Sequence, residues 1–419
     1  MDARARIFFP MLLWACHSTD SADSASGPSQ GSSTADSGLN EPWASGIESV
    51  PDALQISDFI FEPNAVYRVD LTISDEGYSA LSSDPYEYVE GTISFNGTYI
   101  EKVGIRLMGR YGSYRSIDAK PSFKVSFNEF SPGQNLFGLE KMSLKNMITD
   151  YSQIHDVMGY AVHRAAGVPA PRVGYAWVTL NGSDYGLYSN IEIYDEHFLQ
   201  RHYDDPTGNL YDGDYFLFDT GGYTLVDFSP SMDDYFQLDS GEDVGLADIM
   251  AITDAVSATG GSDDFYETLD ELLDWEEFLR FWAVEQWLCA PDSYNYNQNN
   301  YRVYFDKEDG KAELFPWDQD SIYYSTITLT STRGVLATYC QQDPDCMSHL
   351  YEEIDHISDA ADSAHLDELY SQITALIQPY VDADPRREVS ADTIQSYQTL
   401  VSTWISGRSA ALRSSWGLE

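Results

Sequence analysis

The period of the hydrophobic residues changes along this chain, and this change restricts the fold more than any other feature. Residues 65–73 alternate apolar and polar side chains, and residues 88–107 repeat that alternation around an Asn-Gly pair at 96–97. A period of two indicates half-buried strands, and an Asn-Gly pair between two such runs predicts a β-hairpin. Over residues 150–167 the apolar positions instead follow one face of a helix. The chain therefore needs a fold with a sheet and helices in separate regions.

The later segments continue this division. A second hairpin is predicted around the Asn-Gly pair at 181–182, and Asp195 is expected to cap a helix. Residues 203–245 are rich in Asp, Gly and Tyr, show little period and are interpreted as an irregular insertion. Further helices are predicted at residues 246–258 and 275–288, from Ile357 onward, and at 392–412.

Together these elements predict an α+β, two-lobed fold. The expected lobes are a sheet-rich, antiparallel N-lobe over residues 51–195 and a mainly helical C-lobe over residues 196–419. A cleft between two such lobes is a natural site for a nucleotide.

The N-terminus carries a predicted export signal in residues 1–16. Arg4 and Arg6 precede an apolar run that is too short to span a bilayer, and the run ends at Cys16. This arrangement resembles a bacterial lipobox, whose Cys becomes lipidated. We therefore expect an exported protein that is lipid-anchored to the cell envelope or outer surface, with ordinary secretion as the alternative. Residues 17–50 are rich in Ser, Asp and Gly, which predicts a flexible tether.

The other cysteines agree with export. Cys340 and Cys346 flank a turn-forming sequence, and such a pair in an exported protein predicts a disulfide that closes a short loop. Cys289 lies alone in an apolar helical pattern and is expected in the core.

The net charge narrows the classes of partner. The chain has 68 acidic and 23 basic residues, which give a formal charge of −45. Nucleic acid and anionic membrane surfaces would be repelled, so no nucleic-acid partner is expected. Basic proteins and divalent cations are favoured, although solubility alone also accounts for this much acid.

The stretch from residue 290 to residue 320 holds the parts of a phosphoryl-transfer site. Asn297 follows Asp292 by five positions, and Asp318 and Asp320 come after a short strand pattern. Such a site needs a carboxylate to accept the proton of the attacking hydroxyl, and an amide and a carboxylate to hold Mg²⁺. The spacing of Asp292 and Asn297 is that of the protein-kinase catalytic loop. A solvated turn that caps a strand is the alternative.

A basic tract earlier in the chain could supply phosphate contacts. Arg106 and Arg110 lie beside glycines, and Lys124 follows in the next strand pattern. Arginine forks and loop amides suit phosphate oxygens, and a kinase places a phosphate-binding lysine on a strand after its glycine loop. A surface turn with compensating ion pairs remains the alternative for the arginines.

Several short blocks occur in a fixed order along the chain. They are Val103-Gly104-Ile105-Arg106-Leu107 with Gly109, Lys120-Pro121-Ser122-Phe123-Lys124, Leu144-Lys145-Asn146 with Asp150, Asn181-Gly182 with Gly186-Leu187-Tyr188 and Glu192, Asp292 with Asn297 and Tyr301, Pro316-Trp317-Asp318-Gln319-Asp320, and Arg408. In this order, over residues 55–415, they resemble the CotH family of secreted and spore-coat kinases.

The resemblance implies an atypical protein-kinase-like fold and a phosphotransferase activity. It implies ATP and a divalent metal, Mg²⁺ or Mn²⁺ with Ca²⁺ as an alternative, and a protein substrate phosphorylated on Ser or Thr. Asp292 matches the catalytic base, Asn297 and Asp318 match metal ligands, and Asp320 is a candidate second metal contact. The expected substrate is Ser-rich or basic.

The resemblance also implies a set of nucleotide contacts. Lys124 matches the phosphate-binding lysine, with Arg106 and Arg110 as helpers. Its acidic partner is left open between Asp150 and Glu192.

Two other functions compete with the kinase. A non-catalytic, acidic cell-surface scaffold or adhesion protein would use its Asp-rich loops to bind Ca²⁺ or a protein partner. A hydrolase would use paired carboxylates such as Asp318 and Asp320, which lie too close in sequence for that role. The sequence predicts no oligomeric state.

Overall fold

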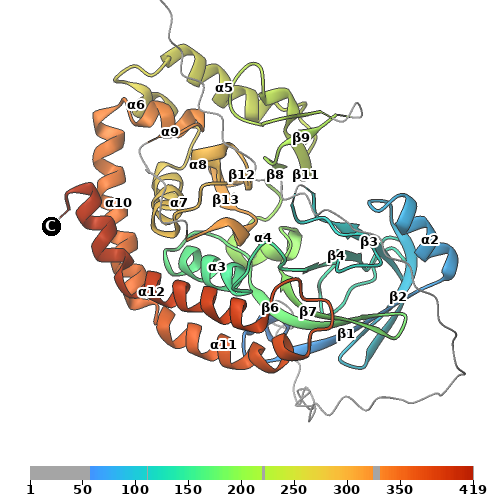
Figure 1. Cartoon of the computed structure of the whole chain (residues 1–419). Coiled ribbons are helices and arrows are strands. Elements are labelled where there is room, and N and C mark those ends of the chain that lie inside the picture. The colour runs from blue at the N-terminus through green and yellow to red at the C-terminus, as the bar shows by residue number, and fades with distance from the viewer. Residues whose placement is uncertain (1–56, 111, 219–221, 324–330, 419) are drawn as a thin grey trace, which may run out of the picture. The chain divides into compact units, whose positions relative to one another are not determined.

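The computed structural model describes residues 57–110, 112–218, 222–323 and 331–418, all of which belong to one compact unit (Figure 1). The predicted signal sequence, the predicted lipidation site Cys16 and the predicted tether lie outside these residues. None of the described helices combines the length and the apolar character that crossing a bilayer requires.

The first half of the described chain forms a closed barrel, in the strand order β1-β2-β3-β4-β5-β7-β6 (Figure 1). Its strands are β1 (Val66–Ile73), β2 (Val89–Phe95), β3 (Thr98–Met108), β4 (Ser122–Ser126), β5 (Lys141–Lys145), β6 (Val173–Leu180) and β7 (Ser183–Ile191). The neighbours are antiparallel except β1 and β6, which pair in parallel and close the barrel. Because the barrel is closed, each of these strands has a neighbour on both sides, whereas an open sheet would leave its two edge strands unpaired on one side.

Both predicted hairpins are confirmed, and their turns show why. β2 pairs with β3 across Asn96 and Gly97, and β6 pairs with β7 across Asn181 and Gly182. All four turn residues have positive φ, between 45° and 89°. Asn and Gly adopt this left-handed region at low cost, and tight two-residue hairpin turns require it.

A second sheet lies in the other half of the chain, with the strand order β11-β8-β12-β13. Its strands are β8 (Asn209–Asp212), β11 (Gln237–Ser240), β12 (Tyr301–Phe305) and β13 (Ala312–Pro316); β9 (Phe216–Leu217) and β10 (Tyr223–Thr224) form a separate pair. The interpretation of residues 203–245 as irregular was therefore wrong for β8 and β11. Each has only four residues, too few to display an alternating pattern.

The remaining elements are mostly helices (Figure 1). Their bounds are α1 (Asp58–Phe61), α2 (Asp75–Ser83), α3 (His155–Ala165), α4 (Glu196–His202), α5 (Ala247–Thr259), α6 (Phe265–Leu269), α7 (Trp275–Leu288), α8 (Tyr294–Asn297), α9 (Val335–Cys340), α10 (Pro344–Ser363), α11 (Leu366–Ala383) and α12 (Ala391–Trp416), with 3₁₀ turns η1 (Asp233–Tyr235) and η2 (Gln319–Ser321). A sheet-built first half and a mainly helical second half confirm the predicted α+β class. The predicted lobe boundary at residue 195 falls between β7 and α4.

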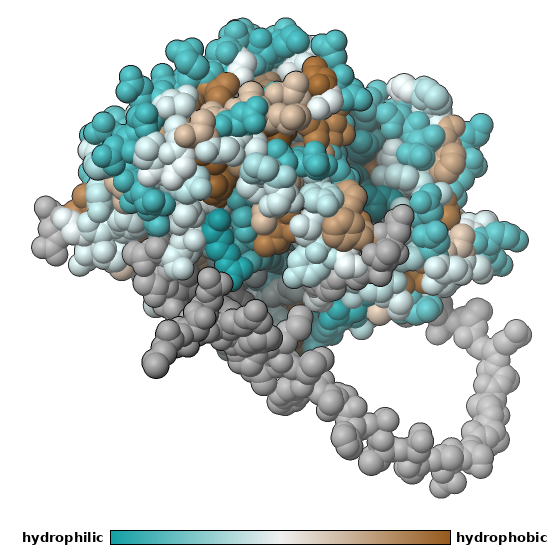
Figure 2. Space-filling view, turned by 90° about the horizontal axis from the view of Figure 1, so that it is seen from above, coloured by the Kyte–Doolittle hydropathy of each residue, from teal (hydrophilic) through white to brown (hydrophobic). Residues whose placement is uncertain are grey.

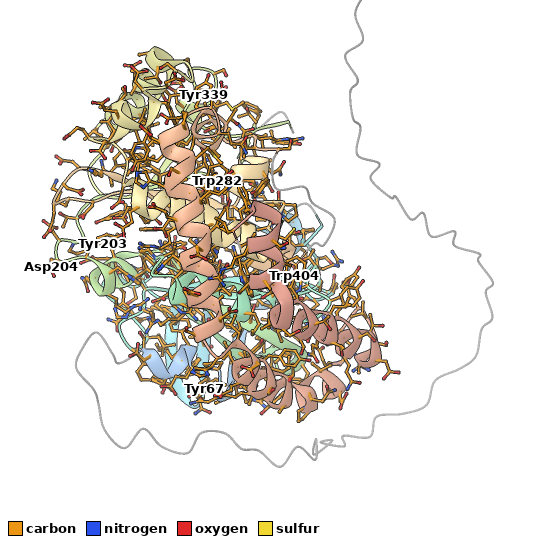
Figure 3. The ribbon with its side chains drawn as sticks, turned by 90° about the vertical axis from the view of Figure 1, so that its left-hand side faces the viewer. Tyr67, Tyr203, Asp204, Trp282, Tyr339 and Trp404 are labelled. Carbon is orange, nitrogen blue, oxygen red and sulfur yellow. A yellow bond between two sulfur atoms is a disulfide. The ribbon has the colours of Figure 1, made fainter. Side chains whose placement is uncertain are left out.

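Helix α7 forms the centre of the helical core. Its Trp282 is fully buried and lies among the helices beside α10 in Figure 3. Trp404 of α12 donates its indole N–H to the backbone carbonyl of Trp287 at 3.2 Å, which joins the last helix to α7. Both tryptophans contribute large buried apolar areas to the fold.

The predicted disulfide between Cys340 and Cys346 is confirmed, and it joins the end of α9 to the first turn of α10. The Asp343 side chain caps α10. This helix begins at Pro344, well before the Ile357 at which the sequence pattern becomes visible. Cys289 is buried, as expected.

A buried ion pair connects the C-terminal helices to the barrel. Lys120 Nζ lies 2.6 Å from Asp384 Oδ2, and both side chains are at most 2% exposed. Asp384 follows α11 and also accepts the backbone N–H of Leu187 in β7. A Cβ atom at Gly186 would lie 2.1 Å from an Asp384 oxygen, so only glycine fits at that position.

The surface agrees with the acidic composition. Figure 2 shows the side that lies at the top of Figure 1, near α5, where hydrophilic residues predominate and hydrophobic side chains gather in separate patches. Met250 of α5 and the nearby Val244 are among the exposed apolar residues.

Candidate active site

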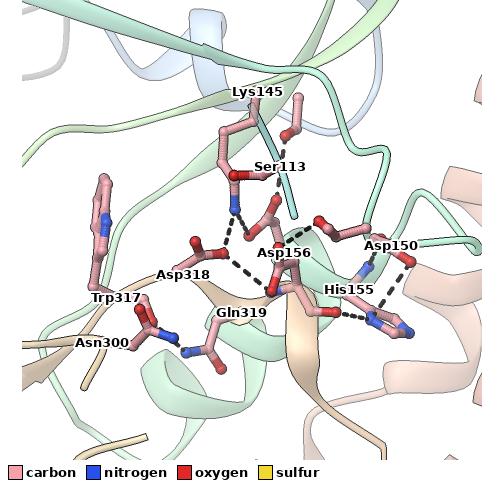
Figure 4. Close-up of polar contacts among 12 residues, drawn as sticks. Ser113, Lys145, Asp150, His155, Asp156, Asn300, Trp317, Asp318 and Gln319 are labelled. Carbon is pink, nitrogen blue, oxygen red and sulfur yellow. Dashed lines mark hydrogen bonds and ion pairs between the residues drawn. The ribbon is translucent and has the colours of Figure 1, made fainter. Parts of the chain in front are cut away.

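Lys145, the last residue of β5, joins two carboxylates (Figure 4). Its Nζ lies 2.6 Å from Asp318 Oδ1 and 3.3 Å from Asp156 Oδ1. Burial lowers the pKa of Lys145, but the charges of Asp156 and Asp318 outweigh burial and raise the pKa above its ordinary value. The lysine is therefore a fixed cation where the barrel meets the second sheet.

Asp156 reaches Lys145 from the first turn of α3 and is buried. The turn before this helix is organised by Asp150, whose carboxylate accepts the backbone N–H groups of Ser152 and His155. Burial raises the pKa of Asp156, Lys145 opposes that rise, and the Ser189 hydroxyl donates to the other carboxylate oxygen at 3.3 Å. Asp156 is thus the helix-borne acid of the lysine pair.

Asp318 reaches Lys145 from the segment after β13. Its backbone is left-handed, with φ of 44°, and its side chain accepts the N–H of Asp320 as the cap of η2. This conformation is uncommon outside glycine and turns the chain sharply after Trp317. The turn directs the carboxylate towards Lys145 (Figure 4).

Asp320 lies close to the same group of charges. The Thr149 hydroxyl donates to its Oδ2 at 2.5 Å, and His155 Nδ1 donates to its backbone carbonyl at 2.8 Å. Burial, and next the charge of Asp318, raise the pKa of Asp320 to about 8. Lys145 and the Thr149 hydroxyl lower this pKa, but they do not offset burial and the charge of Asp318.

Asp292 and Asn297, which the sequence analysis paired, lie in contact. Asn297 Nδ2 donates to Asp292 Oδ1 at 2.6 Å, and Asn299 and Asn300 donate to the same carboxylate at 3.3 and 3.2 Å. Burial raises the pKa of Asp292, the three amides lower it, and the charge of Asp318 raises it further. Asp292 and Asp318 are therefore close enough to influence each other electrostatically.

Lys124 lies elsewhere, in a cavity of about 90 Å³. The cavity is lined by residues from the barrel, from the segment after β7 and from the second sheet: Met108, Lys124, Ser143, Ile193, Tyr194, Asp212, Asp239, Arg302 and Trp317. Burial and the neighbouring Arg106 lower the pKa of Lys124 to about 8. Because Trp317 precedes Asp318, the cavity adjoins the Lys145 site.

The acid expected beside Lys124 is engaged elsewhere. Glu192 forms ion pairs of 2.6 Å with Arg172 and 2.5 Å with Arg201, and Asp150 organises the start of α3. Burial raises the pKa of Glu192, but these two arginines bring it below its ordinary value. In the part of the chain that the structure describes, no carboxylate forms an ion pair with Lys124.

The two arginines of the basic tract face tyrosines rather than the carboxylate cluster. The Arg106 guanidinium lies 5.3 Å from the centre of the Tyr88 ring, and the Arg110 guanidinium lies 5.5 Å from that of Tyr86. Their role as phosphate contacts stays a prediction.

The phosphate-binding role of Lys124 stays a prediction, but Lys145 is the lysine that has a helix-borne acidic partner in the structure. A signal was present in the chain order, because a kinase carries this lysine on a strand followed by the helix that bears its acidic partner. Lys145 ends the strand before α3, whereas Lys124 is one strand further back.

The residues of this site fit a metal ion bound together with phosphates. Among the described residues no group of three or more His, Cys, Asp or Glu is arranged to hold a metal by itself. Mg²⁺ at nucleotide sites uses one or two carboxylates and completes its shell with phosphate oxygens and water. Asp318 offers a carboxylate oxygen of this kind and Asn297 an amide oxygen, and the side chain of Asp318 accepts the backbone N–H of Asp320.

Comparisons with known proteins agree on one family. The sequence matches the family described as CotH kinase protein over residues 105–412. It is 23% identical over 222 residues to the inner spore coat protein H of Bacillus subtilis (strain 168), an alignment that covers 51% of this chain and 57% of that protein. The chain thus spans little more than half the length of this curated relative.

Three solved structures show weak overall similarity. The Helicobacter pylori proinflammatory kinase CtkA is 12% identical, with 71% of this chain and 94% of that chain covered and a TM-score of 0.27. HipA of Shewanella oneidensis MR-1, in its toxin–antitoxin complex with HipB and operator DNA, is 11% identical, with 82% of each chain covered and a TM-score of 0.30. The Golgi casein kinase with Mn/ADP bound is 9% identical, with 87% of this chain and 78% of that chain covered and a TM-score of 0.22.

The family match covers well over half of the chain and includes every residue of the lysine and carboxylate cluster. The protein therefore belongs to the family of CotH kinase proteins.

Proposed function

We propose that this protein transfers the γ-phosphoryl group of ATP to a Ser or Thr hydroxyl of a protein substrate, with Mg²⁺ or Mn²⁺. The observation that carries the proposal is Lys145 Nζ held between Asp156 of α3 and Asp318 after β13. In protein kinases a strand lysine paired with a helix acid contacts the α- and β-phosphates, and an Asp beside it holds Mg²⁺.

The residues then take distinct roles. Lys145 binds and orients the phosphates, and Asp156 keeps it in place. Asp318 and Asn297 would hold the metal ion, which would neutralise charge on the phosphate oxygens. The adjoining cavity beside Trp317, where Lys124 and Arg302 lie, would receive a further part of the nucleotide.

Asp292 is the proton acceptor in this proposal. Its three amide neighbours fix the carboxylate in place, and burial raises its pKa. A carboxylate of raised pKa accepts a proton from a hydroxyl more readily than an ordinary one. Such a base acts when the hydroxyl attacks, by accepting the hydroxyl proton.

The cellular setting is part of the proposal. The export signal and Cys16 support lipid anchoring to the cell envelope, with free secretion as the alternative. The charge of −45 supports a basic protein substrate, because opposite charges favour encounter, and a Ser-rich substrate would supply acceptor hydroxyls.

The test is phosphate transfer by the purified full chain. Labelled ATP with Mg²⁺ or Mn²⁺ is incubated with a Ser-rich basic protein, using the wild type, Asp292→Asn and Lys307→Met. Lys307 is exposed and serves as the control. We expect label with the wild type and the control only. If wild type transfers no phosphate and binds no nucleotide, the non-catalytic scaffold replaces the kinase.

A further inference from the structure

Arg333 contacts the same amide that contacts the proposed base. Its Nη1 donates to Asn297 Oδ1 at 3.1 Å, while Asn297 Nδ2 donates to Asp292 Oδ1 at 2.6 Å. The guanidinium therefore lies one side chain away from the carboxylate that would accept the substrate proton. It reaches this position from the segment between Asp318 and α9.

The backbone that carries Arg333 is firmly held. Its N–H donates to the carbonyl of Asn295 at 2.8 Å, and the N–H of Gly334 donates to the same carbonyl at 3.3 Å. A Cβ atom at Gly334 would lie 2.8 Å from the Tyr294 ring, so this close approach requires glycine. The buried Asp227 accepts the next backbone N–H at 2.9 Å. The α8 segment thus fixes where the arginine side chain begins.

The guanidinium itself is exposed and keeps donors available. Among the described residues Arg333 forms no ion pair with a carboxylate, whereas Arg302 and Arg413 each face several. Other described arginines, such as Arg106 and Arg110, also lack an ion pair, so Arg333 is distinguished by its contact with Asn297. A guanidinium presents five N–H donors in a planar fork that matches phosphate oxygens.

We propose that Arg333 binds the γ-phosphoryl group during its transfer. This inference rests on the proposed function and adds a residue to it. The hydroxyl that loses its proton to Asp292 must lie in line with the γ-phosphorus, so a cation beside Asp292 and Asn297 is closest to the γ-phosphate. Lys145, which pairs with Asp156 and Asp318, is left for the α- and β-phosphates.

The step is a balanced phosphoryl transfer. The substrate oxygen forms a bond to the γ-phosphorus, and the bond from that phosphorus to the bridging oxygen breaks. The electron pair of the broken bond leaves with ADP, and the hydroxyl proton moves to Asp292. If Asn297 Oδ1 held the metal ion, Arg333 would lose this acceptor, and its guanidinium would be free to bind the equatorial oxygens of the phosphoryl group.

Binding of two nucleotides tests the assignment without turnover. The Mn²⁺ complexes of ADP and of the β,γ-imido analogue of ATP are titrated calorimetrically into wild type, Arg333→Met, Arg333→Lys and Lys307→Met. We expect Arg333→Met to bind the imido analogue about tenfold more weakly, the typical effect of losing charged hydrogen bonds to phosphate, while its affinity for ADP changes by less than about twofold. Arg333→Lys should recover part of the loss, and Lys307→Met should match wild type.

The outcomes separate the two claims. Equal weakening of both nucleotides by Arg333→Met, or no change in either, overturns the assignment of Arg333 and leaves the kinase proposal standing. Failure of wild type to bind both nucleotides overturns both. A melting temperature of Arg333→Met equal to that of wild type would show that the variant is folded.

Discussion

Lys145 Nζ and Asp318 Oδ1 lie 2.6 Å apart although 173 positions separate them in the sequence. This ion pair joins the end of barrel strand β5 to the segment that follows β13. It brings the barrel cation and the candidate metal ligand of the second sheet to one point, and the chemistry proposed for this protein depends on that meeting.

The choice between two lysines gives the first prediction. Lys145→Met should lower kcat/KM for ATP by about 100-fold or more, because it removes a charged contact to the phosphates. Lys124→Met should mainly raise the KM for ATP, since Lys124 lines the adjoining cavity. Steady-state kinetics of the two variants decide the matter. Loss of activity in Lys124→Met together with nearly normal activity in Lys145→Met would assign the phosphate role to Lys124.

The second prediction concerns the pH dependence of catalysis. Asp292 must be deprotonated to accept the substrate proton, so kcat should rise with pH through its pKa. Burial raises that pKa, which places the rise above the pH of an ordinary aspartate. Asp292→Asn should lower kcat by about 100- to 10,000-fold and abolish this limb of the profile. An unchanged limb in the residual activity of the variant would assign the titration to another group.

The third prediction concerns Asp320 and stability in the presence of a chelator. Its folded-state pKa of about 8 lies above the ordinary 3.8, so the folded protein binds more protons than the unfolded chain between these values. The free energy of unfolding contributed by this group therefore falls as pH rises from about 4 to about 8. Asp320→Asn should flatten the dependence of Tm on pH in that window.

The matched control for Asp320 is Asp204→Asn, at an exposed position (Figure 3). Thermal denaturation at several pH values compares the two variants with wild type. A slope that Asp320→Asn leaves intact would show that other carboxylates cause it.

The fourth prediction concerns the buried pair between the barrel and the C-terminal helices. Lys120→Met should lower the free energy of unfolding by about 3 kcal/mol, because it leaves the Asp384 carboxylate buried without its partner. The double variant Lys120→Met/Asp384→Leu should lose less, since both charges are then absent. Arg413→Met, which breaks pairs with exposed carboxylates, should cost less than about 1 kcal/mol. Denaturant unfolding measures all three; equal losses in the single and double variants would contradict the assignment.

The parts of the fold that the sequence predicted well have local causes. The Asn-Gly pairs at 96–97 and 181–182 determine turns through backbone angles that few other residues adopt. Asp195 accepts the N–H of Phe198 as expected of a helix cap. Asp292 and Asn297 are five positions apart in one short segment, so their spacing in the sequence already predicts that the two side chains lie close together.

The parts that the sequence missed depend on distant contacts. Lys145 and Asp156 belong to neighbouring elements, but the partner that reveals their role, Asp318, arrives only through the second sheet. Lys124 has the expected glycine tract before it, yet in the barrel its register partner is Arg106. The strands β8 and β11 are defined by their pairing, β8 with β12 and β11 with β8, rather than by their own four residues.

The buried pair of Lys120 and Asp384 also bears on when, during synthesis of the chain, the barrel can become fully stable. All seven barrel strands have been synthesised by Ile191, but the counter-ion of Lys120 leaves the ribosome almost two hundred positions later. Until then Lys120 has no counter-ion in the nascent barrel, so we expect the barrel to gain its full stability only after residue 384 has been synthesised. A recombinant fragment that ends before residue 384 would lack the counter-ion of Lys120 altogether.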